Sequence, residues 1–563
     1  MMHKLQNFQH VLFTACLFTC LTAPGVSFAA PGDLITAFDT DGIVTSNPTT
    51  FDEDSINDVA IDASGIYIVG TDNFTGNTRW RIEKRDLTTG ALITAFDGDG
   101  IIIEDPAPAG GDDVAYDIAV DATYIYVAGS YRDASSRLQW RIKQYNRTTG
   151  AAGWTQVSTF TIGSVAGPYD IAVDTTGIYV VGYDREGTGN DRWRVEKRLL
   201  TTGAVVWTQT FDPTVDARAT AVAVDASGVY IAGMESSIGN HRWRLEKRNL
   251  TTGALITAFD MDGIVNSNPS PSLDTPTGIA VDSSGIYVTG TDNSADFGQW
   301  HIEKYNPTSG AYVAAFGTNG ILTFNPSNDV DEPGAMTIDT TGIYVAGIDS
   351  APGTGDSRWR IEKRNLTTGA LDLTFGPDGI VTENPSAGWD DISAIVNNAN
   401  SLYIGGSDAA VSNFPQWRVE KRDKLCTYCL DCGLRMHDGT SARKIICENP
   451  SASSLRVYKA GGPANGYGVL LTNPATVDAS RFRVQTPAGV KALARYGDWV
   501  LLNTYSGGCY TAPPASGCTY TGTTWQVPGA FTPCRVGQTY CGCVTPFCSY
   551  SCSPPTNYNY QCQ

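Results

Sequence analysis

The stretch Thr277-Gly-Ile-Ala-Val-Asp-Ser-Ser-Gly-Ile-Tyr-Val-Thr-Gly290, followed by Trp300-His-Ile-Glu-Lys-Tyr305, decides the fold. The first phrase predicts two short strands joined by a tight turn, where the glycine tolerates positive φ. The second phrase predicts a third strand whose side chains alternate between its two faces. This pair of phrases occurs seven times between residues 31 and 424, at intervals of 50 to 60 residues. A sheet-rich unit of this length predicts an all-β, seven-bladed β-propeller.

The repeats keep a constant phase. Each copy carries a tyrosine at the same position of its second strand, namely Tyr67, Tyr126, Tyr179, Tyr230, Tyr287, Tyr344 and Tyr403. Each then carries one tryptophan, at Trp80, Trp140, Trp193, Trp243, Trp300, Trp359 and Trp417. A recurring glutamate in strand three, such as Glu246 between two arginines, predicts paired charges between blades, because a buried carboxylate needs partners.

The fourth strand is ambiguous. Five junctions have a long form, as at 254–268, and two have a short form that ends at Phe160 and Phe211. Treating Asn268, Asn325, Phe160 and Phe211 as equivalent gives them equal spacing to the next blade. We therefore expect strand four at Gly-Ile-Val-Thr-x-Asn, preceded by an insertion. The alternative places strand four at Leu-Ile-Thr-Ala-Phe.

The seventh copy ends after Trp417 without an insertion or a fourth strand, and the missing phrase occurs at residues 32–47. Pairing this N-terminal segment with strand three of the seventh blade would remove two open sheet edges. The sequence thus predicts that residues 32–47 complete blade seven.

The repeat resembles known bacterial families. The stretch 277–290 resembles the secreted bacterial β-propeller repeat called SBBP. The phrase Leu371-Asp-Leu-Thr-Phe-Gly-Pro-Asp-Gly-Ile-Val381 resembles the delta-60 repeat, and Leu200-Thr-Thr-Gly-Ala-Val-Val-Trp207 is similar to quinoprotein-type repeats. The resemblance implies an exported or surface scaffold and no particular activity. No family is identified in residues 425–563.

Residues 1–29 have the pattern of a signal peptide, with Lys4 before an apolar run and small residues near Ala29. That run is too short to span a bilayer, and no later stretch is long enough. We therefore expect no transmembrane segment in the mature chain. The expected location is secreted, cell-surface or periplasmic.

The C-terminal region, 425–563, is expected to be a separate Cys-rich module, β-like over 448–503 and dense in cysteine over 509–562. An exported region with an even number of cysteines predicts disulfides, although a metal knuckle at the first four is an alternative. The candidates are Cys426, Cys429, Cys432, Cys447, Cys509, Cys518, Cys534, Cys541, Cys543, Cys548, Cys552 and Cys562.

The formal charge of −19 at pH 7 argues against a nucleic-acid partner, which requires basic patches. The expected partner is an unknown extracellular ligand, glycan or protein. No cofactor is predicted, although Ca²⁺ would suit carboxylate-rich loops. Asp-x-Asp-Gly at 39–42, 97–100 and 260–263 lacks the other ligands of a calcium loop and is interpreted as a turn.

Two sets of connections vary between copies, those between strands two and three and those between strand four and the next blade. Both emerge on one face of a propeller, where function usually lies. They carry acidic and aromatic candidates for binding: Asp52, Glu53, Asp54, Asp72, Asp112, Asp113, Tyr131, Tyr183, Asp184, Phe297, Asp331, Glu332, Trp389, Asp390, Asp391 and Phe414.

Catalytic signals are sparse. The chain after residue 29 has only three histidines, His241, His301 and His437, and no nucleophile elbow, zinc motif or phosphate loop. The main hypothesis is therefore an exported, non-enzymatic propeller that binds through its variable acidic loops. The alternative is an exported metal-dependent hydrolase or lyase. Three or four inward carboxylates on the axis would favour that enzyme.

Overall fold

The computed structural model describes residues 30–424, except for 49–53, 75–76, 108–110, 112, 161–165, 187–188, 214, 238–239, 295–297, 352–355 and 412–413. Beyond residue 424 it describes the course of strands and not their side chains. The chain divides into two compact units, Met1–Leu425 and Cys426–Gln563. The signal-peptide prediction for residues 1–29 lies outside the described residues. The described part of the chain holds no helix long and apolar enough to cross a membrane.

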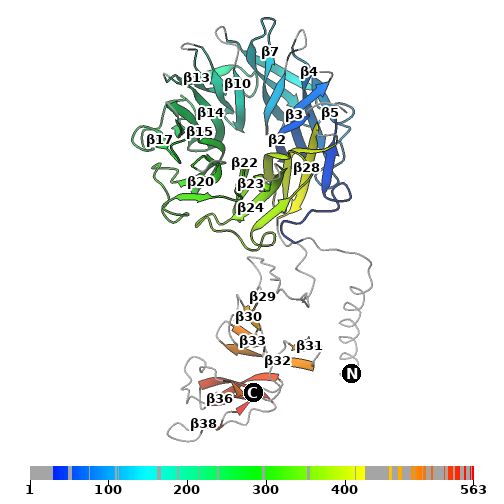
Figure 1. The fold of residues 1–563 in the computed structure, drawn as a ribbon, viewed down its shortest axis with the longest axis vertical. Helices are drawn as coiled ribbons and strands as arrows, with labels where there is room; N and C mark the ends of the chain where they lie inside the picture. The colour runs from blue at the N-terminus through cyan, green and yellow to red at the C-terminus, as the bar shows by residue number, and fades with distance from the viewer. Residues whose placement is uncertain are drawn as a thin grey trace. The chain divides into compact units, whose positions relative to one another are not determined.

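Seven antiparallel sheets of four strands form a ring in the first unit, as Figure 1 shows. In six of the seven sheets the strand order follows the chain, and the first strands of neighbouring sheets contact one another. The first blade consists of β2 (Ser55–Asp62), β3 (Gly65–Phe74), β4 (Asn77–Arg85) and β5 (Ile101–Glu104). The second consists of β6 (Val114–Val120), β7 (Tyr124–Arg132), β8 (Leu138–Asn146) and β9 (Ala152–Ser158). The third consists of β10 (Gly167–Asp174), β11 (Gly177–Asp184), β12 (Arg192–Arg198) and β13 (Val205–Phe211).

The remaining blades follow the same plan, and the prediction of an all-β, seven-bladed propeller is confirmed. The fourth blade consists of β14 (Ala217–Asp225), β15 (Gly228–Ser237), β16 (Asn240–Arg248) and β17 (Ile264–Ser267). The fifth consists of β18 (Thr275–Asp282), β19 (Gly285–Asp292), β20 (Gln299–Tyr305) and β21 (Ile321–Phe324). The sixth consists of β22 (Asp331–Asp339), β23 (Gly342–Ala351), β24 (Asp356–Arg364) and β25 (Ile380–Glu383). The seventh consists of β26 (Asp391–Asn397), β27 (Ser401–Val411), β28 (Phe414–Asp423) and β1 (Ile43–Ser46).

Blade seven is assembled from both ends of the repeat region. Strand β1 pairs antiparallel with β28, with Ser46 opposite Trp417. Upstream of β1, Leu34 forms a bridge with Arg422, and the side chain of Phe38 is fully buried in the cluster that contains Trp417. The N-terminal segment therefore supplies the strand that the seventh copy lacks.

The expected equivalence of the fourth strands is wrong by one or two residues. Trp243 lies opposite Ser267, one residue before Asn268. In the short-form blades, Trp193 lies opposite Phe211 itself, whereas Trp140 lies opposite Ser158, two residues before Phe160. The connections from strand four to the next blade thus differ in length, and equal spacing does not locate the strand ends. The long-form strands do begin at the predicted Gly-Ile-Val phrase.

Repeated polar residues tie neighbouring blades together. In the turn between β2 and β3, the carboxylate of Asp62 accepts the Ser64 amide at 2.7 Å, and the Ser64 hydroxyl contacts the buried Tyr67 hydroxyl at 2.9 Å. From β4, Lys84 Nζ donates to the carbonyl of Arg147 in the next blade at 2.6 Å. Its counterpart in the last blade, Lys421, donates back to a carbonyl of the first blade. These bonds explain why the lysine recurs.

The recurring glutamate of strand three lies in a buried ion pair, as the sequence predicted. Glu246 is fully buried, and its two oxygens contact Arg244 at 2.7 Å and Arg248 at 2.6 Å. Because each oxygen has its own cation, the desolvation penalty of the carboxylate is offset. The same arrangement recurs at Glu83, Glu196, Glu362 and Glu420.

The Asp-x-Asp-Gly phrase forms a turn. Asp39, Asp97 and Asp260 adopt positive φ of 45° to 50°. The second aspartate accepts the amide two residues on, as Asp99 does from Ile101 at 2.9 Å. Backbone geometry therefore accounts for both acids.

The second unit is described only as strands. One sheet has five strands: β29 (Leu455–Lys459), β30 (Tyr467–Leu471), β33 (Trp499–Leu502), β32 (Gly489–Tyr496) and β31 (Arg483–Thr486). The smaller sheets contain β34 (Cys509–Tyr510), β35 (Trp525–Gln526), β36 (Ala530–Val536), β37 (Thr539–Thr545), β38 (Ser551–Cys552), β39 (Tyr558–Asn559) and β40 (Gln561–Cys562). The cysteine side chains lie outside the described part, so the disulfide and metal-knuckle hypotheses stay predictions.

Candidate functional site

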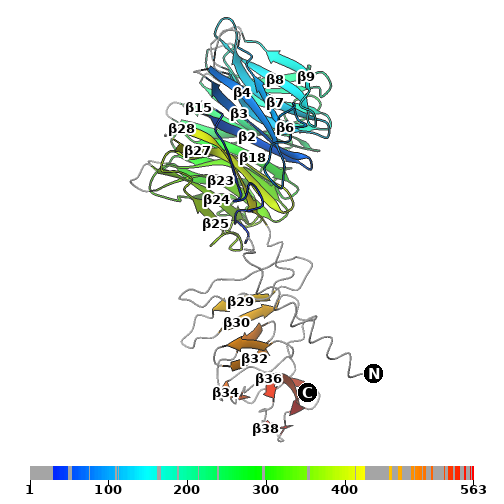
Figure 2. The ribbon, with the colours of Figure 1, turned by 90° about the vertical axis from the view of Figure 1, so that its right-hand side faces the viewer.

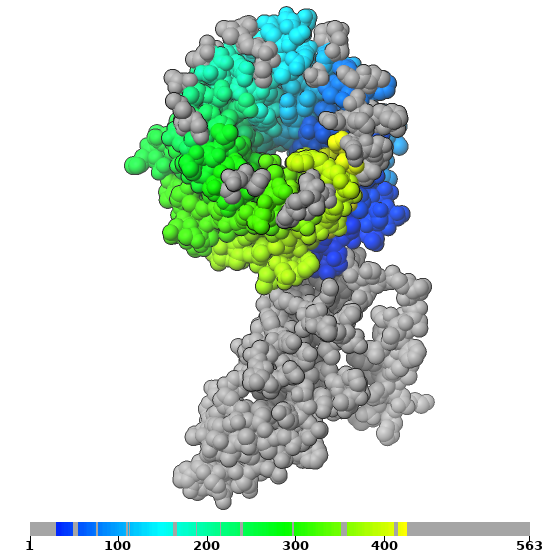
Figure 3. All heavy atoms as spheres, in the orientation of Figure 1, coloured from blue at the N-terminus to red at the C-terminus, as the bar shows by residue number. Residues whose placement is uncertain are grey.

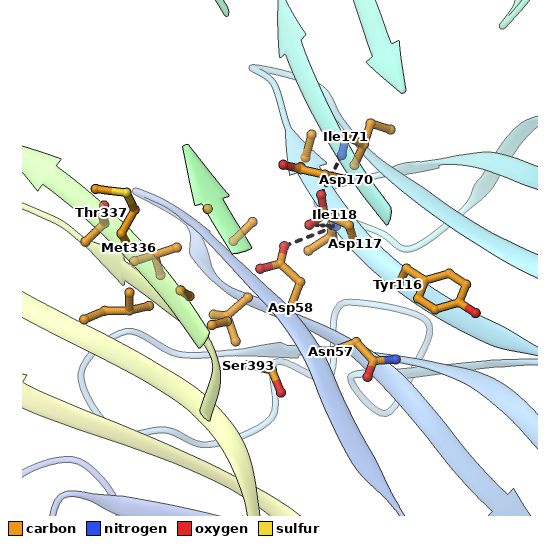
Figure 4. A pocket seen from close by; sticks show the side chains of 18 of the residues that line it. Asn57, Asp58, Tyr116, Asp117, Ile118, Asp170, Ile171, Met336, Thr337 and Ser393 are labelled. Atoms are coloured by element: carbon orange, nitrogen blue, oxygen red, sulfur yellow. Dashed lines mark hydrogen bonds between the residues drawn. The ribbon is translucent and has the colours of Figure 1, made fainter. Parts of the chain in front are cut away.

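A channel of about 490 Å³ runs along the axis of the ring. Its lining comes from the first strand of all seven blades, namely β2, β6, β10, β14, β18, β22 and β26. Figures 2 and 3 show the ring from the side and as a solid body, and Figure 4 shows the channel wall from close by. The volume falls in the range of pockets that bind small molecules, about 300–1,000 Å³.

Each first strand carries a β-bulge where it borders the channel. The register shifts by one residue against the second strand, for example between Ile56 and Asp58 in β2. The bulged residues form one ring, made of Asn57, Tyr116, Tyr169, Thr220, Thr277, Gly334 and Ser393. The residues that follow them form a second ring, made of Asp58, Asp117, Asp170, Ala221, Gly278, Ala335 and Ala394.

The second ring is polar on one side only. Blades one to three contribute aspartates, while blades four to seven contribute alanine or glycine. Each aspartate accepts a backbone amide of the next blade, which satisfies a donor on the inner edge of the sheet. Asp58 accepts Ile118 N at 3.2 Å, and Asp117 accepts Ile171 N at 2.6 Å. Asp170 completes the series by accepting Val222 N at 2.7 Å.

The three carboxyl groups also contact one another. Figure 4 shows Asp58, Asp117 and Asp170 side by side on the wall formed by blades one to three. Burial raises the pKa of Asp58 to about 6. Burial and the charge of Asp58 raise the pKa of Asp117 well above its usual range, and burial and Asp117 do the same for Asp170. The described lining of the channel contains no lysine, arginine or histidine to counter these acids. They therefore retain protons toward neutral pH.

The residues of the first ring make two kinds of contact. Asn57, Thr220 and Thr277 each donate to a carbonyl of the next blade at 2.7 Å. Tyr116 and Tyr169 instead pack edge to face, with ring centroids 6.0 Å apart. The aromatic pair therefore lies on the same side of the channel as the aspartates.

The tyrosine wall continues toward the variable loops. Tyr183, one of the predicted binding residues, is buried and stacks on Tyr169 with ring centroids 5.4 Å apart. Arg218 lies over the Tyr183 ring at 4.8 Å. The fully buried Asp191 forms an ion pair with Arg218. The guanidinium is therefore held in place beside an aromatic surface.

Several predicted loop carboxylates are bonded inside their own blades. Asp54, Asp113, Asp331 and Asp390 have no exposed surface. Asp390, for example, accepts the Ser386 amide at 2.9 Å and the Ala409 amide at 3.2 Å. The other three accept backbone amides at the equivalent place. Burial raises the pKa of Asp113 to about 7.

Two further predicted carboxylates form ion pairs at the start of strand three. Asp72 contacts Arg79 at 2.8 Å, and Asp184 contacts Arg192 at 2.6 Å. Both aspartates are buried. Their oxygens thus position the loop between strands two and three.

Four predicted residues are accessible to a partner. Trp389 is 55% exposed, Glu332 is exposed, and Asp391 and Tyr131 are half-buried. Asp52, Glu53, Asp112, Phe297 and the side chain of Phe414 lie outside the described residues.

The residues predicted from the sequence do not include the channel wall. The signal lies in Tyr-Asp at 116–117 and 169–170 and Asn-Asp at 57–58, where the other four copies have Thr-Ala, Thr-Gly, Gly-Ala or Ser-Ala within the first strand. An alignment of the seven copies at this position separates blades one to three from the rest. The bulge that brings this position to the channel is not visible in the sequence.

Three inward carboxylates meet the criterion stated above for the enzyme alternative. The hydrogen bonds of these carboxyl groups argue against a metal-dependent enzyme, because each group already accepts a backbone amide and contacts a neighbouring acid. Within the described ranges, no group of three or more His, Cys, Asp or Glu side chains is arranged to hold a metal ion.

Comparison with known proteins gives distant structural likenesses and no family. No protein-family model matches the chain, and no curated protein matches it. Among solved structures, the chain is similar to the quinohemoprotein alcohol dehydrogenase of Comamonas testosteroni (11% identity, 70% of this chain and 69% of that chain, TM-score 0.39). It is also similar to Sqt1 of Chaetomium thermophilum (12% identity, 68% and 100%, TM-score 0.36). A europium-containing methanol dehydrogenase gives 9% identity, 65% and 81% coverage and a TM-score of 0.37.

Proposed function

We propose that this chain is an exported, non-enzymatic binding protein whose ligand enters the axial channel from the face of the variable loops. The observation that carries the proposal is the division of the channel into two unlike walls. In an otherwise repetitive ring, blades one to three each bring an aspartate to the second ring of the channel, where blades four to seven bring alanine or glycine, and blades two and three add a tyrosine each. The scaffold alone does not require this division.

The two walls suit a ligand with two unlike sides. Carboxyl groups that keep protons both donate and accept hydrogen bonds, which matches hydroxyl or amino groups. The opposite wall offers Ala335, Met336 and Ala394, which match hydrocarbon, together with the hydroxyl groups of Thr337 and Ser393. The hydroxyl groups of Thr220 and Thr277 on this wall already donate to backbone carbonyls. A small molecule or an extended side chain with one polar and one apolar side fits this arrangement.

The variable loops would form the entrance. Glu332 is the second residue of β22 and Asp391 the first of β26, and each lies two residues before a channel-lining residue, Gly334 or Ser393. The exposed Trp389 lies two residues before β26. These accessible residues could therefore contact a ligand in the variable loops as it enters the channel.

The test is a binding screen on the full chain with monosaccharides, oligosaccharides and linear alkylamines, read by thermal shift and then by calorimetry. Ser393→Phe adds a phenyl ring to the channel from the wall formed by blade seven. The matched control is Leu373→Phe, which adds the same ring at a position that is 54% exposed and outside the channel lining. We expect a ligand whose binding is lost in Ser393→Phe and retained in the control. Binding that survives Ser393→Phe would overturn the channel as the site.

The enzyme alternative keeps one specific observation in its favour, the three axial carboxyls. A metal-dependent hydrolase or lyase requires that Asp117→Asn abolish binding of Ca²⁺, Mn²⁺ or Zn²⁺ measured by calorimetry. If the intact chain and Asp117→Asn give the same heats with all three ions, the axial metal site is excluded.

A further inference from the structure

The outer edges of the blades are of two kinds. Five blades end in a strand of four residues, and in all five the segment before that strand is bridged to strand three, as Leu255 is to Arg248. Blades two and three lack the insertion and end in strands of seven residues, β9 and β13. Each of the two is the last strand of its sheet. Short or covered edges prevent unwanted strand pairing, so these two edges are the open ones.

Strand β13 has the composition of a pairing edge. Its residues, Val-Val-Trp-Thr-Gln-Thr-Phe, include no charge and are mostly β-branched or aromatic. Val205 and Val206 are 47% and 45% exposed. In the part that follows, Thr210 is exposed, Thr208, Gln209 and Phe211 are half-buried, and Trp207 is buried by its packing within the ring. A long, uncharged and exposed edge strand is a template for a strand of another chain. Strand β9 is also uncharged but contains Ala152 and Gly153, which contribute little side-chain contact.

The regular part of β13 is complementary to itself. A bulge leaves Val206 out of the ladder with β12, and pairing is regular from Trp207 to Phe211. An antiparallel copy centred on Gln209 places Trp207 opposite Phe211 and Thr208 opposite Thr210. Aromatic pairs and threonine pairs are among the favourable cross-strand pairs. No like charges meet in this register.

We propose that β13 is the docking edge for a second copy of this chain, paired antiparallel about a twofold axis at Gln209. The net charge of −19 makes two copies repel over most of their surfaces. An uncharged edge is where the two can approach without that repulsion. The interface is isologous and closes on itself, so the assembly stops at a dimer. Figure 1 shows β13 on the outer rim of the ring, away from the channel, so the dimer is independent of the proposed ligand.

The test measures the mass of the full chain by sedimentation equilibrium over a wide range of concentration. We expect a twofold mass at high concentration for the intact chain. Thr208→Lys/Thr210→Lys places lysines opposite lysines in the proposed register, and we expect a single-chain mass. The control Ile103→Lys adds one lysine to the short edge strand β5, at a position that is 39% exposed, and should stay dimeric.

Charge reversal separates pairing from misfolding. Thr208→Glu/Thr210→Glu should also be monomeric alone, whereas an equimolar mixture with the lysine variant should restore the twofold mass. The proposal is overturned if the intact chain stays a monomer throughout. It is also overturned if the lysine variant still dimerises, if the mixture fails to pair, or if only Thr155→Lys in β9 breaks the dimer.

Discussion

Removing residues 31–48 should open the ring. The deletion takes β1 from blade seven and exposes the edge of β28. It also removes the side chains of Phe38 and Val44, which are 0% and 4% exposed. Loss of a buried phenylalanine costs about 3–5 kcal/mol and loss of a buried valine about 1.5–3 kcal/mol. The sum of about 5–8 kcal/mol, before any hydrogen bonds are counted, is a large share of the 5–15 kcal/mol typical of a folded domain.

A transposed variant provides the control. The segment from Leu34 to Asn47 is moved behind Arg422 and joined by a copy of the turn Asn249–Ala254, because Leu34 bridges Arg422 as Leu255 bridges Arg248. The junction then reads like the long-form copies, and blade seven becomes continuous. We expect the deletion to lower the urea midpoint strongly and the transposition to restore most of it. The assay is tryptophan fluorescence, since Trp417 lies opposite Ser46. A deletion that unfolds at the same urea concentration as the intact chain would refute the closure.

Three other perturbations test the interior, each by urea unfolding of the full chain. The raised pKa of Asp58, about 6, means that the folded state binds a proton more tightly than the unfolded state, so the contribution of Asp58 to stability is fully present below pH 4 and is lost as pH rises through 6. Asp117→Asn, which cannot ionise, should make stability depend less on pH. An unchanged dependence of stability on pH would contradict the interaction between Asp58 and Asp117. His301 contacts Glu303 at 3.2 Å and Asp292 at 3.6 Å, which outweigh burial and raise its pKa to about 9, so its stabilisation is present below pH 6.5, is lost as pH rises through 9, and should be absent in His301→Gln. Glu196→Gln leaves Arg198 buried without its charge partner and should cost about 3–5 kcal/mol, whereas the exposed control Asp378→Asn should cost almost nothing.

The repeat itself made the blades predictable. Strands two and three recur almost unchanged, because strand two of every blade buries a tyrosine and strand three buries a tryptophan. The spacing of the blades is therefore visible in the sequence. The incomplete seventh copy and the unmatched phrase at residues 32–47 predicted how the ring closes. The paired charges around Glu246 were predictable for the same reason, since the arginines recur two residues before and after the glutamate.

The channel and the loop chemistry were harder to predict. Whether an acid such as Asp390 faces solvent or bonds a backbone amide depends on loop geometry, which the residue types do not encode. The bulge that turns Asp58 and Asp117 toward the channel arises from pairing between strands. Variation between copies pointed to these loops as the place of function. Some of their carboxylates, however, accept backbone amides and hold the loops to the strands.

Closure by β1 also determines how the propeller responds to force. The amide of Gly32 bonds the carbonyl of Asp423, so the chain enters and leaves the ring at neighbouring points. Tension between those points would peel β1 from β28 one hydrogen bond after another, the geometry with the least mechanical resistance. The six blades built from consecutive strands would not be loaded until that seam had opened.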